Sequence, residues 1–338
     1  MNIPITQSKA WQKLQNDLKE TSFFEKTPDF QYLAILKTTP VGNYLYLPYG
    51  PVYADKSGFR KALKSLTKLA NEHSSIFIRI EPQDPHFTSY APSTTKKSKD
   101  LNPKETWVLD LTGNDDVLKA KLPSRLLRYH KSANKKGITI ETSHSPDDIH
   151  YLLDLQKTLA DEKGINTFSE EYLKTELSQP FATLYLVRRC DKDDVDGRPS
   201  WGDPQRAQAR AEHDGGNCEV RTRRGEIIAA GLVFDDKTVR YNLQGAQNDQ
   251  GRKLHATGIL TVQLILDAKA KNLKTFDFWG IAPDNASKNH PWAGFTVFKK
   301  TFAGTEVDYA GTYDIVMSPA KYHLYRLFRA LNRIIRKH

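Results

Sequence analysis

The run NYLYLPYGPVY (residues 43–53) decides the fold, because the chain repeats its plan later. The run alternates like a strand and contains the glycine of a loop. A basic amphipathic helix pattern follows, and the strand-like run SIFIRIEP (75–82) closes the unit. The apolar side of that helix carries Phe59, Leu63, Leu66, Leu69 and Ala70. The period of the apolar residues changes from about 2 to about 3.6 and back. This change predicts a strand, a loop, a helix and a second strand.

The second copy of this plan begins with VRYNLQGAQND (239–249) and ends with KTFDFWGI (274–281). Between them lies a helix pattern whose apolar side carries Leu260, Leu264, Ile265 and Ala268. The spacing from Gly50 to Ile80 is similar to that from Gly245 to Phe278. We therefore predict an α/β fold built by duplication, with two similar domains side by side and a substrate cleft between them.

The length of 338 residues fits about two domains. We place the first domain at 1–144, the second at 145–310 and a basic amphipathic helix at 311–338. Within the second domain, residues 190–224 are rich in Gly, Asp, Arg and Pro and poor in apolar residues. This composition predicts a long disordered insertion.

Charge is unevenly distributed along this basic chain, whose formal net charge is +10. The last 18 residues carry six Lys or Arg and no acid. A second cluster comprises Lys119, Lys121, Arg125, Arg128, Lys131, Lys135 and Lys136. Such an excess suits an anionic partner such as RNA, a nucleotide phosphate or an acidic membrane surface, and a solvated helix face is the simpler reading of each run.

The terminal helix pattern also has an apolar stripe of Leu324, Leu327, Phe328, Leu331, Ile334 and Ile335. Two interpretations stay open: the stripe lies on an anionic membrane, or it packs on the first domain and leaves the arginines in water.

Common catalytic motifs are absent from the sequence. It has no P-loop, no GxGxxG, no HExxH, no CxxC pair and no GxSxG, and its ten histidines lack ligand spacing. The cysteines, Cys190 and Cys218, are too few for a disulfide framework. With no apolar signal core at the start, we expect a cytoplasmic, monomeric protein without a structural metal.

The run FTVFKKTFAG (295–304) places two lysines among aromatic residues. As a strand it would turn Lys299 and Lys300 to opposite faces, so we predict that the two lysines have different roles.

Seven runs in order resemble the FemABX family, the Fem peptidyl aminoacyltransferases. They are YLPYGPV (46–52), IFIRIEP (76–82), WVLDLT (107–112), KSANKKGI (131–138), GINTFSEEYL (164–173), FDFWGI (276–281) and VFKKTFAG (297–304). The resemblance covers about Gln7 to Tyr325. It implies two tandem GNAT-like domains, and the lack of a long heptad run is similar to members without a coiled-coil arm.

The resemblance also implies a reaction. A tRNA-dependent aminoacyltransferase would move an amino acid from aminoacyl-tRNA, its co-substrate, to the side-chain amine of a stem peptide in peptidoglycan bridge formation. The acceptor would be UDP-MurNAc-pentapeptide or a lipid-linked muropeptide, with peripheral contact at the inner membrane face through the terminal helix. No cofactor is implied.

Site residues follow from the resemblance one position at a time. In VFKK, Lys299 would stabilise the oxyanion and the tRNA 3′-terminal phosphate, and Phe298 would stack on a base or shape the pocket. Four residues would contact the precursor: Lys13 in AWQKL (10–14), Tyr172 in FSEEYL (168–173), Tyr241 in RYNLQGA (240–246) and His86 in EPQDPHF (81–87). The chain departs from the family pattern at Phe168 and Leu243, which stand where an arginine and a tyrosine are expected.

The general base stays open at this point. Asp277 and Glu81 end the two matching strands and are the candidates, whereas Asp110 fits a packing role. Two other functions also stay open: an acyl-CoA-dependent GNAT N-acyltransferase, for which QNDQGRKLHATG (247–258) partly fits a pyrophosphate turn, and a non-catalytic basic module that binds RNA or a membrane.

Overall fold

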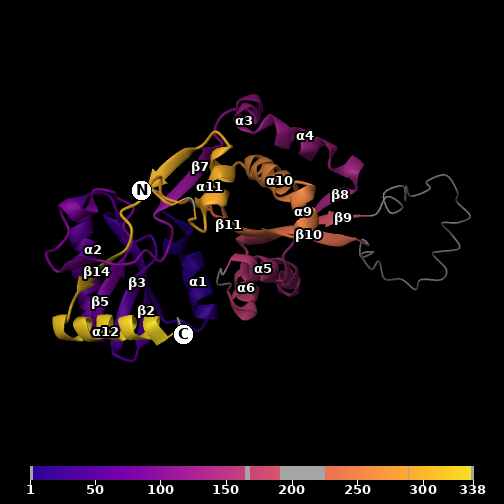
Figure 1. The fold of residues 1–338 in the computed structure, drawn as a ribbon. Coiled ribbons are helices and arrows are strands. Elements are labelled where there is room, and N and C mark those ends of the chain that lie inside the picture. Colours follow the sequence, from indigo (N-terminus) through magenta and orange to yellow (C-terminus); the bar gives the residue numbers. More distant parts are fainter. Residues whose placement is uncertain (1–2, 164–167, 191–224, 288, 336–338) are drawn as a thin grey trace, which may run out of the picture. The chain divides into compact units, whose positions relative to one another are not determined.

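The computed structural model describes residues 3–163, 168–190, 225–287 and 289–335 (Figure 1). The chain forms two compact units: unit 1 holds Met1–Leu109 and Asp277–His338, and unit 2 holds Asp110–Phe276. These bounds differ from the domains predicted at 1–144, 145–310 and 311–338, because the chain returns to unit 1 after Phe276. The predicted insertion lies outside the described residues, apart from buried Cys190 at its start.

Unit 1 contains the strand–helix–strand unit of the first repeat. Its elements are η1 (Ile5–Gln7), α1 (Lys9–Asp17), β1 (Ser22–Lys26), β2 (Phe30–Thr39), β3 (Gly42–Leu47), β4 (Val52–Tyr53), α2 (Lys56–Glu72), β5 (Ser75–Ile80), η2 (Phe87–Ser89), β6 (Thr95–Lys97), β7 (Glu105–Asp110), β12 (Thr275–Gly280), α11 (Ala293–Lys300), β13 (Thr305–Asp308), β14 (Tyr313–Val316) and α12 (Pro319–Ile335). Strands β7 and β12 cross the boundary between the units.

The main sheet of unit 1 has the order β1-β2-β3-β5-β14-β6, with β4 paired to β2. Strands β3 and β5 are parallel, as a strand–helix–strand unit requires, and the other strand pairs described in this sheet are antiparallel. Strand β14, from the end of the chain, pairs with both β5 and β6. The last segment of the sequence therefore completes the sheet of the first repeat.

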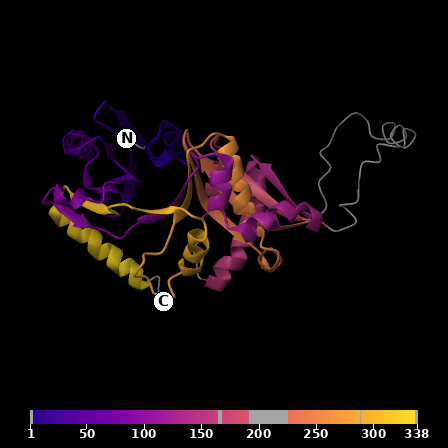
Figure 2. The same cartoon turned by 90° about the horizontal axis from the view of Figure 1, so that it is seen from above.

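Helices α2 and α12 cover opposite faces of this sheet (Figure 2). Asp55 caps α2 by accepting a hydrogen bond from the Gly58 backbone, and the apolar side of α2 packs on the face that carries Leu45 and Ile78. On the other face, Tyr322 and Tyr325 of α12 pack against Phe77, Ile76 and Tyr44. Strand alternation explains why the adjacent Phe77 and Ile78 of β5 lie on opposite faces.

Unit 2 carries the second repeat and the helices before it. Its elements are α3 (Asp115–Lys121), α4 (Ser124–Ser132), η3 (Asn134–Lys136), β8 (Ile138–Ser143), η4 (Pro146–Asp148), α5 (Ile149–Lys163), α6 (Glu170–Leu177), β9 (Ala182–Arg189), β10 (Glu226–Asp235), β11 (Val239–Gln247), α9 (Asp249–Lys253) and α10 (Ala256–Ala270). Strands β8, β9, β10 and β11 pair in this order, each antiparallel to the next.

Helices lie on both faces of the unit 2 sheet. Figure 1 shows α10 and α4 on one face and α5 and α6 on the other. Most of α10 is buried, including Ile259, Val262 and Ile265, as expected for a helix that is apolar on nearly all sides. Pro123 separates α3 from α4, and the left-handed Gly137, with φ 67°, ends η3.

The α/β fold class is confirmed by the two sheets and by both strand–helix–strand units. No long helical arm occurs among the described residues, of which α2 and α12 are the longest helices. Within that same part of the chain, no helix combines the length and the apolar character that crossing a membrane demands.

One predicted strand is wrong. Residues 293–300 form helix α11, so Lys299 and Lys300 do not point to opposite faces of a strand. The run is rich in aromatic and β-branched residues, which favour strands. Its phenylalanines, however, stand at 295, 298 and 302, and these steps of three and four residues match one side of a helix. Phe302, just after the helix, contacts Phe278 of β12 at 5.0 Å between ring centroids and anchors α11 there.

Candidate active site at the end of strand β12

Strand β12 ends in a backbone conformation that bulky residues rarely adopt. Trp279 has φ 66°, in the left-handed region that favours glycine. Its backbone N–H donates a hydrogen bond to Oδ1 of Asp277 at 2.7 Å. A residue held in this region costs about 1–2 kcal/mol, and such outliers cluster at functional sites. The outlier is therefore a reason to look for a site at this strand end.

A second left-handed aromatic residue lies against the first. Tyr49, in the turn after β3, has φ 51°, and its ring contacts Trp279 edge-on at 5.6 Å between centroids. Tyr309 contacts Tyr49 at 5.3 Å. The Tyr49 hydroxyl donates to the carbonyl oxygen of Pro103 at 2.8 Å, which fixes the ring. One aromatic–Gly pair, Tyr49–Gly50, follows β3 in the first repeat, and another, Trp279–Gly280, ends β12 in the second. The rings of Tyr49 and Trp279 touch.

Helix α11 brings a lysine to this strand end. Nζ of Lys299 donates to the carbonyl oxygen of Gly280 at 2.6 Å, and Thr296 accepts a hydrogen bond from the Ala282 backbone at 2.7 Å. Burial lowers the pKa of Lys299 to about 8, although the charge of Asp277 acts in the opposite direction. Lys299 is therefore a cation that can lose its proton only slightly above neutral pH.

Asp277 is the carboxyl group whose charge acts on this lysine. Its side chain is 4 % exposed. Burial raises its pKa to about 7, while the Trp279 N–H and the charge of Lys299 act in the opposite direction. A buried carboxyl group and a buried amine whose charges influence each other, with pKa values of about 7 and about 8, are candidates for acid–base chemistry.

Glu81, the other candidate base, has a different environment. Its carboxylate accepts hydrogen bonds from the Tyr46 hydroxyl at 3.1 Å, from the Asn102 side chain at 2.7 Å and from the Thr312 hydroxyl at 2.9 Å. The Tyr49 backbone donates to it as well. A carboxylate that accepts this many hydrogen bonds organises the loops around β5. Of the two strand-end acids, Asp277 is thus the better candidate.

The neighbouring lysine is held differently. Lys300 pairs with Asp284 at 2.9 Å and Glu306 at 3.1 Å, and these partners raise its pKa. The different environments of Lys299 and Lys300 agree with the prediction of different roles, although the helix and not a strand separates them. Phe298 is partly buried and packs edge-on against Phe302 at 5.5 Å.

Two predicted precursor contacts lie elsewhere in unit 1. Lys13 projects from α1 into solvent and pairs with Asp17 at 2.6 Å, both side chains being well exposed. Its neighbour Trp11 is buried. His86 is exposed, and its backbone donates to Asp84 at 2.8 Å. Neither position tests the predicted contact.

The other two predicted contacts lie in unit 2. Tyr241 is 6 % exposed, and its hydroxyl donates to Asp236 at 3.0 Å. Tyr172 is partly buried on α6, where Glu176 is its hydrogen-bond partner and where Phe168 stacks on its ring at 4.9 Å. Phe168 itself is 53 % exposed, so the residue that replaces the expected arginine is a surface aromatic.

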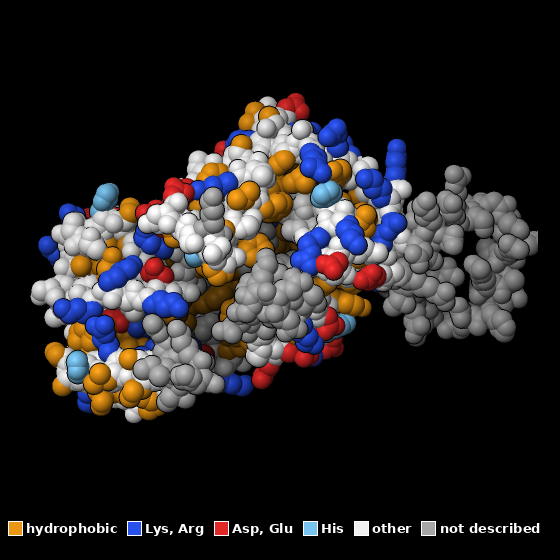
Figure 3. Space-filling view, viewed as in Figure 1, with side chains coloured by type: hydrophobic (Ala, Val, Ile, Leu, Met, Phe, Trp, Pro, Cys, Tyr) orange, Lys and Arg blue, Asp and Glu red, His pale blue; other side chains and the backbone are white. Residues whose placement is uncertain are grey.

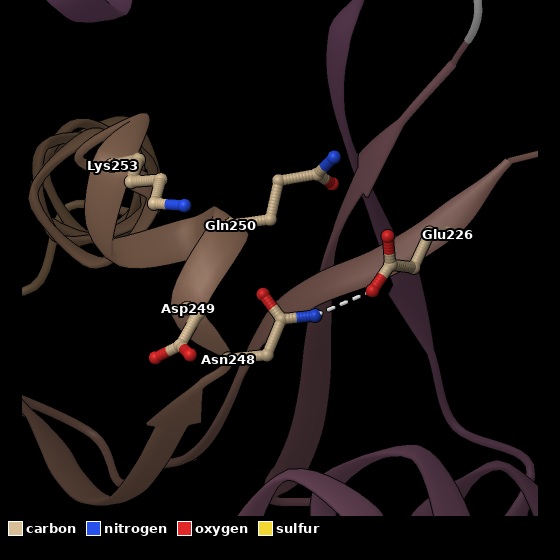
Figure 4. Close-up of a pocket in the computed structure, with 5 residues that line it drawn as sticks. All are labelled: Glu226, Asn248, Asp249, Gln250 and Lys253. Atoms are coloured by element: carbon tan, nitrogen blue, oxygen red, sulfur yellow. Dashed lines mark hydrogen bonds between the residues drawn. The ribbon is translucent and has the colours of Figure 1, made fainter.

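The segment proposed as a pyrophosphate turn lines a pocket of about 510 Å³ in unit 2 (Figure 4). The short helix α9 occupies this segment, and its cap Asn248 donates to Glu226 at 2.6 Å. The lining also includes Asp249, Gln250 and Lys253. Two carboxylates against one lysine disfavour a doubly charged anion, so this pocket is a poor site for the pyrophosphate of an acyl-CoA.

A basic surface covers α4 and η3 in unit 2, where Figure 3 shows blue side chains gathered over these helices. Its exposed cations are Arg125, Arg128, Lys131, Lys135 and Lys136. In the described part of the chain, none of them forms an ion pair with a carboxylate. Within this surface, the Tyr129 ring stacks on His255 at 4.6 Å and lies 5.3 Å from both Arg125 and Lys136. Unpaired cations around an aromatic ring are typical of nucleic-acid surfaces.

The sequence indicated Lys299 and listed Asp277, but it did not indicate the aromatic residues around them. The signal that could have found them is the aromatic–Gly pair, which occurs at Tyr49–Gly50 and again at Trp279–Gly280. A bulky residue before a glycine at a strand end gives no sign of its own φ, so the left-handed conformations emerged only from the structure.

The chain is similar to several known proteins. The model of the FemAB family matches residues 205–330. The crystal structure of FemX has 17 % identity, with 95 % of this chain and 94 % of that chain covered and a TM-score of 0.74. The C-terminal domain of a putative lysylphosphatidylglycerol synthetase from Agrobacterium fabrum has 14 % identity, with 96 % and 93 % covered and a TM-score of 0.55.

L-PGS from Bacillus licheniformis has 11 % identity, with 98 % and 99 % of the two chains covered and a TM-score of 0.54. None of the curated protein sequences matches this chain significantly. At these identities the structural matches concern the fold, and they extend over the whole length of both chains. The FemAB family model thus matches residues 205–330, and the chain shares its fold with FemX over 95 % of its length.

Proposed function

We propose that this protein is an aminoacyltransferase that moves an amino acid from aminoacyl-tRNA to the side-chain amine of a peptidoglycan stem peptide. The observation that supports the proposal most is the pair of Lys299 and Asp277 at the end of β12, where an amine and a carboxyl group both titrate near neutral pH. The match of residues 205–330 to the FemAB family model supports the reaction class. Transfer of an acyl group to an amine is the chemistry that this pair suits.

In the proposed reaction, the acceptor nitrogen attacks the carbonyl carbon of the aminoacyl ester and forms the new amide bond. The carbonyl oxygen gains negative charge, which the ammonium group of Lys299 stabilises. The bond to the ribose oxygen then breaks, and the tRNA leaves with a free hydroxyl group. Asp277 accepts the proton that the nitrogen loses and returns it to the ribose oxygen, so that no co-reactant is needed.

The ester is already activated, so positioning carries much of the rate. Holding the amine against the ester can supply roughly 7–11 kcal/mol in favourable cases. The fixed ring of Tyr49 and the hydrogen bond from Lys299 to Gly280 keep the site rigid. In this proposal Phe298 shapes the pocket beside Lys299 or stacks on a base.

The tRNA dependence is supported by the basic surface of α4 and η3. Its five cations have no carboxylate partners among the described residues, and two of them, Arg125 and Lys136, lie over the Tyr129 ring. A phosphate backbone is the partner that such a surface suits, and binding to it should weaken as salt rises. The carboxylates in the pocket beside α9 favour this donor over an acyl-CoA.

The proposed acceptor is a nucleotide-linked or lipid-linked muropeptide, with Lys13, His86, Tyr172 and Tyr241 as its contacts. Lys13 is the most accessible of them, because it is held only by a solvent-exposed ion pair. Tyr241 would first have to release Asp236. We propose no cofactor, a cytoplasmic monomer and, for the lipid-linked acceptor, contact of the terminal helix with the membrane.

The test is a transfer assay with purified full-length protein. Labelled aminoacyl-tRNA is mixed with a UDP-linked or a lipid-linked muropeptide, and acetyl-CoA serves as the control donor. Mass spectrometry identifies the product. We expect one added amino acid on the stem peptide and no acetyl product. Transfer from acetyl-CoA without transfer from tRNA would contradict the proposal.

A further inference from the structure

The exposed face of helix α12 carries a stripe of leucines. Leu324, Leu327 and Leu331 are 55 %, 50 % and 60 % exposed. Their spacing of three and four residues places them on one side of the helix. Figure 3 shows hydrophobic side chains gathered along α12 at the lower left. Large apolar side chains that gather in water mark an interaction surface.

Packing inside unit 1 does not account for this stripe. A different side of α12, with Tyr322 and Tyr325, packs against Phe77 of β5. The Tyr322 hydroxyl also donates to buried Asp314 at 2.9 Å, which fixes the helix to the sheet. The sequence alone predicted one continuous stripe that included Phe328. The structure divides the apolar residues into a packed tyrosine side and an exposed leucine side.

The charges around the stripe indicate what covers it. At about 100° per residue, Lys321 lies to one side of the leucines and Arg326 to the other, and both are exposed. The sequence from Lys321 to the end has six Lys or Arg and no acid. A second copy of the helix would bring like charges together, whereas an anionic bilayer accepts leucines in its acyl region and cations among its headgroups.

We propose that Leu324, Leu327 and Leu331 of α12, with Lys321 and Arg326 beside them, form a docking surface for an anionic lipid bilayer. The tyrosine side holds the helix on unit 1 while the leucine side enters the interface. The surface stands independently of the transfer reaction, since none of its residues belongs to the site around Lys299. It would place the enzyme where a lipid-linked substrate is found.

The test is flotation of the full chain with two kinds of vesicle, one of mixed phosphatidylglycerol and phosphatidylcholine and one of phosphatidylcholine alone. We expect the wild type to float with the anionic vesicles only, and to do so less at high salt. The variant L324S/L327S/L331S should bind the anionic vesicles at least about tenfold more weakly than the wild type. Because these side chains are exposed, its melting temperature should stay close to that of the wild type.

The control is Leu101→Ser, a leucine that is 46 % exposed elsewhere in unit 1. It should float like the wild type. Equal binding to neutral vesicles, or equal binding by the triple variant, would overturn the proposal. So would a dimer in light scattering that the triple variant loses while vesicles capture neither protein, because a second copy would then be the partner. None of these readouts depends on catalysis.

Discussion

Lys299 and Asp277 shift each other's protonation at the end of strand β12. Burial lowers the pKa of Lys299 to about 8 and raises that of Asp277 to about 7, and the charge of each residue opposes the shift of the other. The proposed reaction needs a charged lysine and a charged carboxylate at the same time. Both charges are present together mainly in the narrow pH range between about 7 and about 8.

This pair predicts a bell-shaped pH dependence of transfer. Activity should rise as Asp277 loses its proton near a pKa of about 7 and fall as Lys299 loses its own near a pKa of about 8. The measurement is kcat/KM for aminoacyl-tRNA across pH. In the pH profile of the activity that remains, Asp277→Asn should flatten the rise near pH 7 and leave the fall near pH 8 unchanged. A profile that rises steadily beyond pH 9 would exclude a charged lysine from the rate-determining step.

The buried carboxyl group also predicts a change in stability. The pKa of Asp277 is raised from 3.8 to about 7 in the folded protein, so its charge disfavours folding. This cost begins above the unfolded pKa and is complete above the folded pKa. Asp277→Asn should therefore raise the melting temperature more at about pH 8 than at about pH 5, by about 2–4 °C for each kcal/mol recovered. Equal changes at both pH values would show that Asp277 is not buried as a charge.

The left-handed conformation of Trp279 predicts an unusual order of stability. With φ at 66°, glycine can occupy the position without strain, whereas alanine cannot. Trp279→Gly and Trp279→Ala both lose the contact with Tyr49, so the comparison isolates the backbone. We expect the glycine variant to be more stable by about 1 kcal/mol in urea unfolding. A more stable alanine variant would mean that this conformation is not held in solution.

The basic surface predicts a specific effect on the donor substrate. Arg128→Gln with Lys131→Gln should raise KM for aminoacyl-tRNA severalfold, leave kcat nearly unchanged and reduce the salt slope of binding by about one for each lost phosphate contact. The matched control is Arg60→Gln with Lys64→Gln, which removes one exposed arginine and one exposed lysine from α2. Equal effects of the two double variants would mean that net charge matters and the α4 surface does not.

The sequence predicted what depends on periodicity and left out what depends on tertiary contact. Alternation and helical spacing located β3, α2 and β5, and the second repeat likewise, because each of these elements buries one regular face. The helix at 293–300 was missed because its aromatic and β-branched residues favour a strand, and only packing against Phe278 decides the matter. The sequence named the leucine stripe of α12 and left open whether it packs on the first domain, because only tertiary contact shows that Tyr322 and Tyr325 are the side that packs.

For the site, Lys299 and Asp277 were both named from the sequence, and their relationship was not. Residues 277 and 299 come together because α11 folds back onto the strand end, where Lys299 reaches Gly280. The departure at Phe168 was visible in the sequence, and the structure adds that this ring stacks on Tyr172. An aromatic pair there suits an apolar or ring-shaped part of a substrate better than a phosphate.

The most direct test compares Lys299→Met with Lys300→Met in single-turnover transfer from labelled aminoacyl-tRNA to a muropeptide. The two lysines are adjacent in α11 and differ in environment, since Lys299 binds the Gly280 carbonyl and Lys300 pairs with two carboxylates. If Lys299 stabilises the oxyanion, Lys299→Met should slow transfer by about 10²–10³-fold with the fold intact, and Lys300→Met should change the rate little. Full activity of Lys299→Met, with loss of transfer in Lys300→Met, would contradict it.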